Sequence, residues 1–343
     1  MKPKSFLALM TVTALAAGGA WWGVQQRAAS TAGEFIDQPL LPGLTARLND
    51  VHGLQIAKAA EQVTLVRSGD TWKAPDKGDY PARFEKVRSL LVGLSQLKVA
   101  ERKTADASLH DRLDLAPTEA KDSKSIRVTL LDAGGKTIAD LFVGKQRYGG
   151  GGLSAGVYVR RAEESQTWLA KGDLEVRDPA VDWLDRGIVD LAGKRVAEAR
   201  VGQPDGSIMV LTKAEADKED FTLAGIPEGH KVSSQYSVNA TAGVLERLTF
   251  DDVRRAEGLS FGEPVSTYRT HDGLTAAASF AEADGKTWLR LTVTAADGAA
   301  EEVRKEAAEI SQKLNGWAYQ LAEWKVNQIR RKMSELIEAE KQS

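Results

Sequence analysis

A run without a charged residue, Ser5–Val24, constrains this chain more than any other feature of its sequence. A bilayer core of about 30 Å is crossed by about 20 apolar residues in a helix, and this run has that length. Its two tryptophans lie at the far end, where indole rings favour a membrane interface. The run therefore predicts a transmembrane anchor. The side chains expected to meet the lipid and its interface are Phe6, Leu9, Leu15, Trp21 and Trp22.

The flanks of this run indicate its orientation. Lys2 and Lys4 precede it, and positive residues keep the adjoining end of a membrane helix in the cytoplasm. We therefore expect residues 1–27 to form a single-pass anchor in the cytoplasmic (inner) membrane, with the bulk of the chain in the periplasm. A cleaved signal peptide is the alternative, because Gly18-Gly19-Ala20 offers small residues at a processing site. The anchor is favoured because the apolar run continues beyond the short core of a signal peptide.

Composition excludes several classes of function. The chain of 343 residues has 46 Lys and Arg against 48 Asp and Glu, so it lacks the overall positive charge that attracts nucleic acid. It has no Cys, which excludes disulfides, thiolate metal ligands and cysteine nucleophiles. Its 31 Gly residues, many of them in Asp-Gly and Gly-Gly pairs, indicate tight turns and hence much β structure.

Beyond the anchor, the pattern predicts an α+β fold of two related modules, each made of antiparallel strands with packed helices. Residues 28–37 are small and polar and are expected to form a stalk, and the modules are expected over residues 38–190 and 191–343. In each module short alternating strands come first, a helix follows, and further strands complete the set. The evidence for a repeat is this order of elements and not sequence identity, so a chance resemblance between two α+β halves is the alternative.

The first module shows this order most clearly. Leu54 and Ile56 alternate with polar neighbours, as in a half-buried strand. An amphipathic helix is expected over residues 84–97. Its predicted apolar face consists of Phe84, Val87, Leu91 and Leu94. A second set of strands is then expected from residue 126, and residues 178–191 are expected to form a short helical linker.

The second module repeats the order and ends in helices. Strands are expected around Val196 and Val210, and a helix is expected through Val244. A helix at the C-terminus closes the module, and its predicted apolar side chains are Val326, Ile329, Met333 and Leu336. Four tryptophans beside strand patterns are predicted to lie in the core, namely Trp72, Trp168, Trp288 and Trp317.

Seven segments carry a resemblance through their order and spacing. They are the N-terminal anchor, Gly69-Asp70-Thr71-Trp72, Leu90-Leu91-Val92-Gly93-Leu94, Thr167-Trp168-Leu169, Trp183-Leu184-Asp185-Arg186, Phe250-Asp251-Asp252-Val253 and Gly316-Trp317-Ala318-Tyr319-Gln320-Leu321. Together they resemble the DUF4340 family, a domain of unknown function in bacterial envelope proteins. Ala322 departs from the pattern, which has a proline after the last strand. The resemblance implies an envelope protein associated with ABC-transporter-like systems of the gliding-motility type, and it supplies no catalytic residues.

Asp185 and Arg186 beside Trp183 form the most informative charged pair. One interpretation is structural, with an ion pair and an aromatic wedge that clamp the two modules. The other is a protein-binding interface, because Trp and Arg are favoured at interface centres. The four histidines, His52, His110, His230 and His271, lack the spacing of a zinc site and are expected at the surface or in turns. We therefore expect no catalytic residue, no metal and no cofactor.

The sequence favours a non-enzymatic protein anchored in the inner membrane. It would act as an accessory or scaffold, with envelope proteins such as ABC-transporter-like subunits as its partners. The alternative is a periplasmic binding module for a cell-wall glycan or a small solute. A hydrolase with dispersed carboxylates is a third interpretation.

Overall fold

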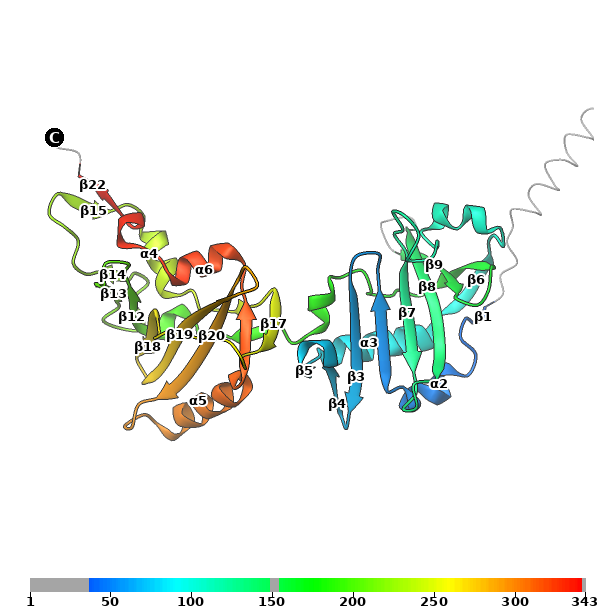
Figure 1. Ribbon diagram of the computed structural model, residues 1–343, viewed down its shortest axis with the longest axis horizontal. Coiled ribbons are helices and arrows are strands. Elements are labelled where there is room, and N and C mark those ends of the chain that lie inside the picture. Colours follow the sequence, from blue (N-terminus) through cyan, green and yellow to red (C-terminus); the bar gives the residue numbers. More distant parts are fainter. Residues whose placement is uncertain (1–36, 149–153, 341–343) are drawn as a thin grey trace, which may run out of the picture. The chain divides into compact units, whose positions relative to one another are not determined.

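The computed structural model describes residues 37–148 and 154–340, which form two compact units (Figure 1). Unit 1 contains residues 37–73 and 82–183, and unit 2 contains residues 74–81 and 184–340. The predicted anchor residues Phe6, Leu9, Leu15, Trp21 and Trp22 lie outside the described residues. Within the described ranges, no helix is both long enough and apolar enough to cross a bilayer.

Both units combine helices with antiparallel strands, which confirms the α+β class predicted from the sequence. The contacts divide the chain between Trp183 and Leu184, whereas the sequence placed a boundary between residues 190 and 191. The sequence pattern also gave no indication that residues 74–81 belong to unit 2, although unit 1 residues flank them on both sides.

Unit 1 is built on one antiparallel sheet. Its strands are β1 (Gln38–Pro39), β2 (Gly53–Ala57), β3 (Gln62–Ser68), β4 (Thr71–Ala74), β6 (Lys98–Arg102), β7 (Ile126–Leu131), β8 (Thr137–Tyr148), β9 (Ser154–Arg161) and β10 (Thr167–Lys171). They lie in the order β1-β6-β10-β9-β8-β7-β2-β3-β4. Its helices are α2 (Leu44–Arg47) and α3 (Phe84–Gln96). Short 3-10 turns are η1 (Leu48–Asp50), η3 (Ala107–Leu109), η4 (Asp111–Leu113) and η6 (Ala180–Trp183).

Alternation sets which face of this sheet is buried. Leu54 lies between Leu65 of β3 and Leu130 of β7 in register, and all three side chains are buried. The strand predictions in this region are therefore confirmed. In α3 the buried face consists of Val87, Leu90 and Leu94, while Phe84 is 46% exposed, so its predicted place on the apolar face is wrong. The physical reason is position, because Phe84 is the first helical residue and the buried stripe begins one turn later.

Unit 2 contains a main sheet of eight strands and two pairs of short strands. Its strands are β5 (Tyr80–Pro81), β11 (Gly187–Val189), β12 (Val196–Gly202), β13 (Ile208–Thr212), β14 (Thr222–Leu223), β15 (His230–Val232), β16 (Leu248–Thr249), β17 (Asp252–Arg255), β18 (Ser266–Thr270), β19 (Leu274–Ala283), β20 (Lys286–Ala295), β21 (Trp317–Gln320) and β22 (Ile337–Ala339). The main sheet has the order β14-β13-β12-β18-β19-β20-β21-β17, and β11 pairs with β16 and β15 with β22. Its helices are α4 (Gln235–Ala242), α5 (Glu301–Leu314) and α6 (Glu323–Ile329). Its 3-10 turns are η2 (Pro75–Lys77), η7 (Gly193–Arg195) and η8 (Met333–Glu335).

Three predicted helices differ from the structure. The helix expected through Val244 is α4, which ends earlier, at Ala242. Residues 178–191 contain a 3-10 turn and the strand β11 in place of a helical linker. The last helix ends at Ile329, and the chain then enters η8 and β22. Met333 N donates to the side-chain oxygen of Gln203 at 2.9 Å, and Ser266 Oγ donates to the carbonyl of Ile329 at 2.5 Å. These bonds replace the helical ones, so tertiary contacts override the apolar period of the sequence.

Residues 74–81, which we call the arm, are held in unit 2 by an aromatic cluster. Tyr80 is 2% exposed, and its ring lies edge-on to Phe250 at 5.3 Å and to Trp317 at 4.8 Å between centroids. Arg255 lies over the ring of Trp317 at 3.8 Å, and its Nε donates to the carbonyl of Gly78 at 2.9 Å. Edge-on aromatic pairs add stability beyond their buried area, so the arm is an integral part of the core of unit 2.

The main sheets of the two units share one connectivity. The main-sheet strands are counted from β2 in unit 1, without the two-residue strand β5, and from β12 in unit 2. In this count both sheets have the order third, second, first, fifth, sixth, seventh, eighth and fourth. A helix lies between the third and fourth strands in both, namely α3 and α4. Unit 2 differs by the insertion of α5 between its seventh and eighth strands, and unit 1 by the extra edge strand β1.

Candidate functional site

Trp183 lies in the core of unit 1 at the end of η6. Its side chain is fully buried, and Lys86 Nζ lies 4.9 Å from the centre of its ring. Its carbonyl accepts a hydrogen bond of 2.8 Å from Arg83 N at the start of α3. The indole N–H has no hydrogen-bond partner among the described residues. The side chain therefore contributes packing, and no part of it is available to a partner in this conformation.

Asp185 and Arg186 lie in unit 2 and bind several groups there. Lys313 Nζ lies 3.1 Å from Asp185 Oδ2, and the Tyr80 hydroxyl donates to the Asp185 carbonyl at 3.1 Å. Arg186 Nε donates to the carbonyl of Phe250 at 2.8 Å. Both side chains are partly exposed. The clamp and the protein-binding interface both stay predictions for this pair.

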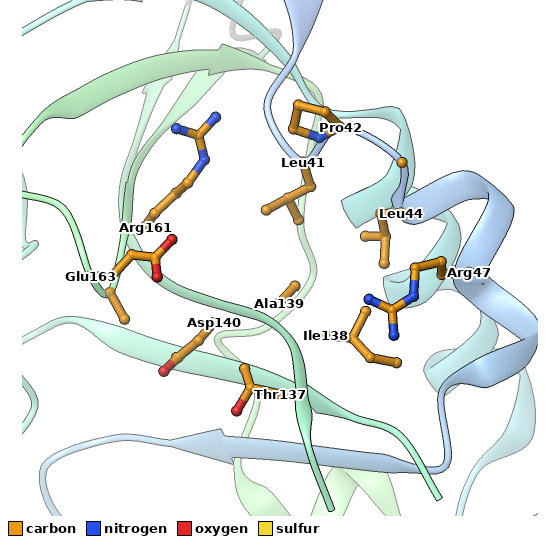
Figure 2. Close-up of a pocket in the computed structure, with 12 residues that line it drawn as sticks. Leu41, Pro42, Leu44, Arg47, Thr137, Ile138, Ala139, Asp140, Arg161 and Glu163 are labelled. Atoms are coloured by element: carbon orange, nitrogen blue, oxygen red, sulfur yellow. The ribbon is translucent and has the colours of Figure 1, made fainter.

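A cavity of about 500 Å³ in unit 1 is the first candidate for a binding site (Figure 2). It lies between the segment that contains α2 and the strands β8 and β9. Figure 2 shows Arg161 and Glu163 on one side of it and Leu44 and Arg47 on the other. Ile138 and Leu44 add apolar surface to its wall.

Two charged groups at this cavity, Arg161 and Asp140, are already bound within the protein. Arg161 donates through Nε and Nη2 to the carbonyl of Leu40, at 3.1 and 2.6 Å, and through Nη1 to Glu164 at 2.7 Å. Asp140 accepts two hydrogen bonds from Arg127, at 3.0 and 2.7 Å. Charged groups that are already paired in this way bind few further ligands. These hydrogen bonds therefore hold the segment that contains α2 against the sheet.

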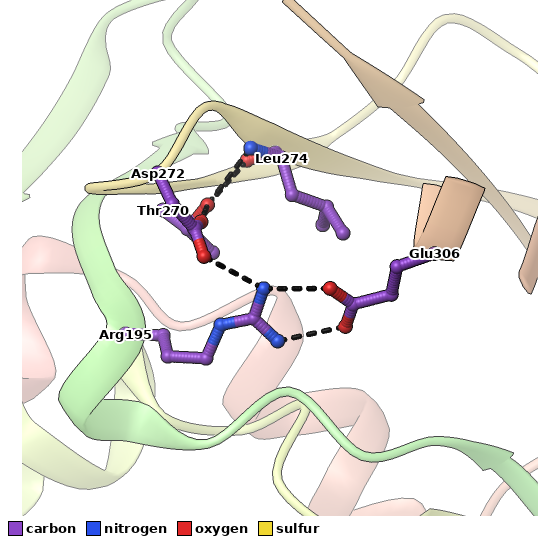
Figure 3. A network of polar contacts seen from close by, with 5 residues as sticks. All are labelled: Arg195, Thr270, Asp272, Leu274 and Glu306. Carbon is purple, nitrogen blue, oxygen red and sulfur yellow. Dashed lines mark hydrogen bonds and ion pairs between the residues drawn. The ribbon is translucent and has the colours of Figure 1, made fainter. Parts of the chain in front are cut away.

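Unit 2 contains a second polar cluster, centred on Arg195 (Figure 3). Its guanidinium donates to both oxygens of Glu306 on α5, at 2.7 and 2.9 Å, and to Asp272 at 2.9 Å. Thr270 Oγ1 donates to the other oxygen of Asp272, and the amide N–H of Leu274 donates to Thr270 Oγ1 at 2.8 Å. Arg195 thereby connects the start of β12, the turn between β18 and β19, and the helix α5 (Figure 3).

Electrostatics in this cluster favours its charged forms. The hydrogen bond to Glu306 raises the pKa of Arg195 above its ordinary value. Burial alone would raise the pKa of Asp272, but the hydrogen bonds from Thr270 and Arg195 outweigh it, so this pKa lies below its ordinary value. The raised pKa of Arg195 and the lowered pKa of Asp272 both favour the ionised forms of these two groups at neutral pH. The cluster therefore acts as a structural clamp and lacks the perturbed acid–base pair of a catalytic centre.

The histidines are separate from one another. His110 lies in the bend between η3 and η4, as one of the two predicted locations required, but it is buried, with Nε2 2.9 Å from the carbonyl of Ser165. His52 and His230 each lie close to a nearby backbone carbonyl in a turn, at 3.0 and 3.2 Å. Across residues 37–148 and 154–340, no three His, Cys, Asp or Glu side chains are grouped closely enough to hold a metal ion.

Sequence reasoning did not find the Arg195 cluster, because its members are far apart in the chain. Arg195 is separated by 77 residues from Asp272 and by 111 residues from Glu306. No spacing rule connects residues that are so far apart in the sequence. They come together only because the fold of unit 2 places their elements side by side. The exposed Trp324 was likewise missed, since it lies in a short helix without a distinctive pattern.

A family model places this fold among known sequences. The model for DUF4340, a domain of unknown function, matches residues 72–267, which is more than half of the chain. The chain belongs to the DUF4340 family. The match begins just before the arm and ends in β18, so the DUF4340 signature includes parts of both units. Comparisons with curated proteins and with solved structures gave no match.

Proposed function

We propose that this DUF4340 protein is a membrane-anchored, extracytoplasmic accessory or scaffold protein that works by contact with other envelope proteins. Its N-terminal run would hold it in the inner membrane, with two related modules on the periplasmic side. The observation that carries the proposal is the tandem itself, in which a run long enough for a bilayer leads into two units of one strand order. ABC-transporter-like subunits are the partners that we propose.

The shared connectivity supports a common origin of the two modules. Eight strands can be arranged in a sheet in very many orders, and both units use the same one, with a helix at the same place in the order. Tandem copies of a β-rich domain offer two related surfaces on one chain, which suits a protein that holds several partners together.

The internal pairing of the charged side chains supports a role in binding other proteins. The guanidinium groups of Arg161 and Arg195 are bound by acceptors of their own unit. Such clusters fix the positions of loops and helices, and a rigid surface is what a scaffold presents to its partners.

Cell fractionation tests the anchor. The full-length protein should remain with membranes after carbonate extraction, because a transmembrane helix resists alkaline treatment. The fragment that begins at Ala28 should be soluble and should keep the circular-dichroism spectrum of a mixed α/β protein. Full-length protein that carbonate releases would contradict the anchor. Protease added to spheroplasts should digest the body of the protein, whereas a protected body would contradict the periplasmic location.

Crosslinking in cells tests the scaffold. A photoreactive amino acid at an exposed position, such as Phe84 on α3, would be irradiated in living cells, and the captured proteins identified by mass spectrometry. Enrichment of an ATPase and a permease over a strain with the same amino acid at buried Leu90 would support the proposal. Capture that is equal at the exposed and the buried position would count against it.

A further inference from the structure

A cavity of about 840 Å³ in unit 2 has features that the scaffold role does not use. It lies among the end of β13, the loop before β14, and the helices α4 and α6. Five basic side chains line it against three acidic ones, Asp217, Glu219 and Glu246. Its size is in the range of sites that hold organic ligands rather than single ions.

Lys213 is a buried cation in the wall of this cavity. It continues the alternation of Met209 and Leu211 along β13, so the strand directs it to the buried face, and it is 4% exposed. Its Nζ donates to the carbonyl of Gly193 at 2.9 Å and lies 4.7 Å from the ring centre of Phe221. No carboxylate of the described chain pairs with it, so two of its three N–H groups have no acceptor there. A buried ammonium without an anion is costly, and an anionic ligand would remove that cost.

Lys325 is a second lysine at the same cavity. Its Nζ lies 3.4 Å from the carbonyl of Val244 and 4.6 Å from the ring centre of Trp324, and none of the described carboxylates forms an ion pair with it. Burial lowers the pKa of both Lys213 and Lys325, as expected for cations with reduced hydration. At Lys325 the nearby charge of Glu246 acts in the opposite direction and offsets only part of this effect.

Two aromatic side chains at the cavity are exposed. Trp324 on α6 is 59% exposed and Tyr236 on α4 is 81% exposed, although large aromatic groups usually lie inside a protein. Exposed aromatic rings offer an apolar face with polar edges, and the C–H face of a sugar ring packs well against such a surface. Gln328 beside them supplies an amide that can bind hydroxyl groups. The amide of Asn239 is held by Phe221, Gln235 and Asp220 within unit 2.

We propose that this cavity binds an anionic saccharide, with its carboxylate on Lys213 and Lys325 and a sugar ring against Trp324 or Tyr236. The two lysines without carboxylate partners supply the charge selectivity, and the exposed rings supply affinity for the sugar. This site is independent of the scaffold role, so either proposal can fail without the other.

Binding of a matched pair of ligands tests the site. Trigalacturonate and its methyl ester share one sugar backbone, but the ester lacks the charges. Isothermal titration of the full-length protein in detergent should show that trigalacturonate binds at least about tenfold more tightly than the ester, and that its affinity falls with added salt. Equal affinity for the two, or no binding of trigalacturonate, would overturn the proposal. Inorganic phosphate that binds as tightly as trigalacturonate would also overturn it, because the aromatic groups would then have no part.

Variants separate the site from the fold. Lys213→Met should weaken trigalacturonate binding by about tenfold or more while the melting temperature stays equal or rises, because an apolar group of similar size replaces an uncompensated charge. Trp324→Ala should weaken both ligands, with the melting temperature nearly unchanged. Lys305→Met, at an exposed position of α5, is the matched control and should bind as the wild type does. Wild-type affinity in both Lys213→Met and Lys325→Met would overturn the assignment of the carboxylate.

Discussion

The two units use one strand order but complete their cores in different ways. Unit 1 has α3, a helix of 13 residues whose buried stripe packs within the unit. The corresponding helix of unit 2, α4, has only 8 residues, and unit 2 adds α5, a helix of 14 residues that contacts β20 and β19. Unit 2 also recruits the arm, residues 74–81, from the middle of unit 1.

This difference shows what a shared connectivity leaves undetermined. The strand order fixes which strands are neighbours, but each sheet must still cover its apolar face with whatever helices the chain supplies. Unit 1 does so with a single long helix, whereas unit 2 uses two helices and a cluster of aromatic rings around Tyr80. The following substitutions test whether the two units are stabilised separately.

The largest effect is expected from Tyr80→Ala in the arm. Removing a buried aromatic ring costs about 3–5 kcal/mol, so hydrogen exchange should accelerate in β17 and β21 of unit 2. The strands β7 and β8 of unit 1 should keep their protection. Tyr80→Phe is the control, and it should cost about 1 kcal/mol, because it removes only the hydrogen bond to the Asp185 carbonyl. Equal acceleration in both units would show that they unfold together.

Trp183→Ala tests whether unit 1 can be destabilised without an effect on unit 2. This side chain is fully buried in unit 1, and we expect a loss of about 3 kcal/mol, at the lower end for an aromatic group because its N–H has no partner to lose. Hydrogen exchange should now accelerate in β3 and in α3, while β19 and β20 stay protected. An unchanged melting temperature together with lost partner capture would instead support the protein-binding interface.

Gly144→Ala should destabilise unit 1 by about 2 kcal/mol, through overpacking. A Cβ at this position of β8 would lie 2.1 Å from the carbonyl oxygen of Leu113 and 2.9 Å from the side chain of Leu115. Gly262→Ala in unit 2 is the matched control, because no atom lies within 4 Å of its added Cβ. Urea denaturation measures both changes, and a Gly144→Ala protein as stable as the control would contradict the close approach of the loop to β8.

The smallest effect is expected from Asp272→Asn in the Arg195 cluster. The side chain of Asp272 is 41% exposed, so solvent screening limits its contribution to about 0.5–1 kcal/mol at neutral pH. Its pKa is lowered in the folded protein, so its stabilisation is present above the ordinary value of 3.8 and is lost as the pH falls through the folded pKa. The difference in stability between wild type and variant should therefore shrink below about pH 3.8 and stay constant from pH 5 to 8. A difference that grows on acidification would contradict the assigned sign.

Much of the fold could be predicted because short-range patterns determine it. The alternation of Leu54 and Ile56 gave a strand, and both side chains are buried. Asp284-Gly285 is one of the Asp-Gly pairs that indicated tight turns. It connects β19 and β20, and both residues adopt the positive φ that such a turn requires. Trp72, Trp288 and Trp317 are buried as predicted beside strands, whereas Trp168 is only half-buried. In each case the deciding interactions lie within a few residues.

The remainder depends on contacts between distant residues. Nothing near Tyr80 in the sequence indicates that its ring packs against Phe250, which lies 170 positions later. Asp252 begins the strand β17, where Lys77, 175 residues earlier in the chain, binds its carboxylate at 2.7 Å. Lys213 could have been noticed from the sequence, since alternation along β13 places it on the buried face. That no carboxylate of the described residues pairs with Lys213, in contrast, can be seen only in the structure, where every neighbour of its side chain is known.

The arm also makes the complete fold of unit 2 dependent on residues that are encoded within unit 1. A fragment that begins at Leu184 carries most of unit 2 but lacks Tyr80, and a fragment that ends at Trp183 displays that ring without its partners. During synthesis, the aromatic cluster around Tyr80 cannot form until the ribosome has translated Tyr319, more than two hundred codons after Tyr80 itself. Recombination that exchanged one unit without the other would separate Tyr80 from its aromatic partners, so the two units must be inherited together.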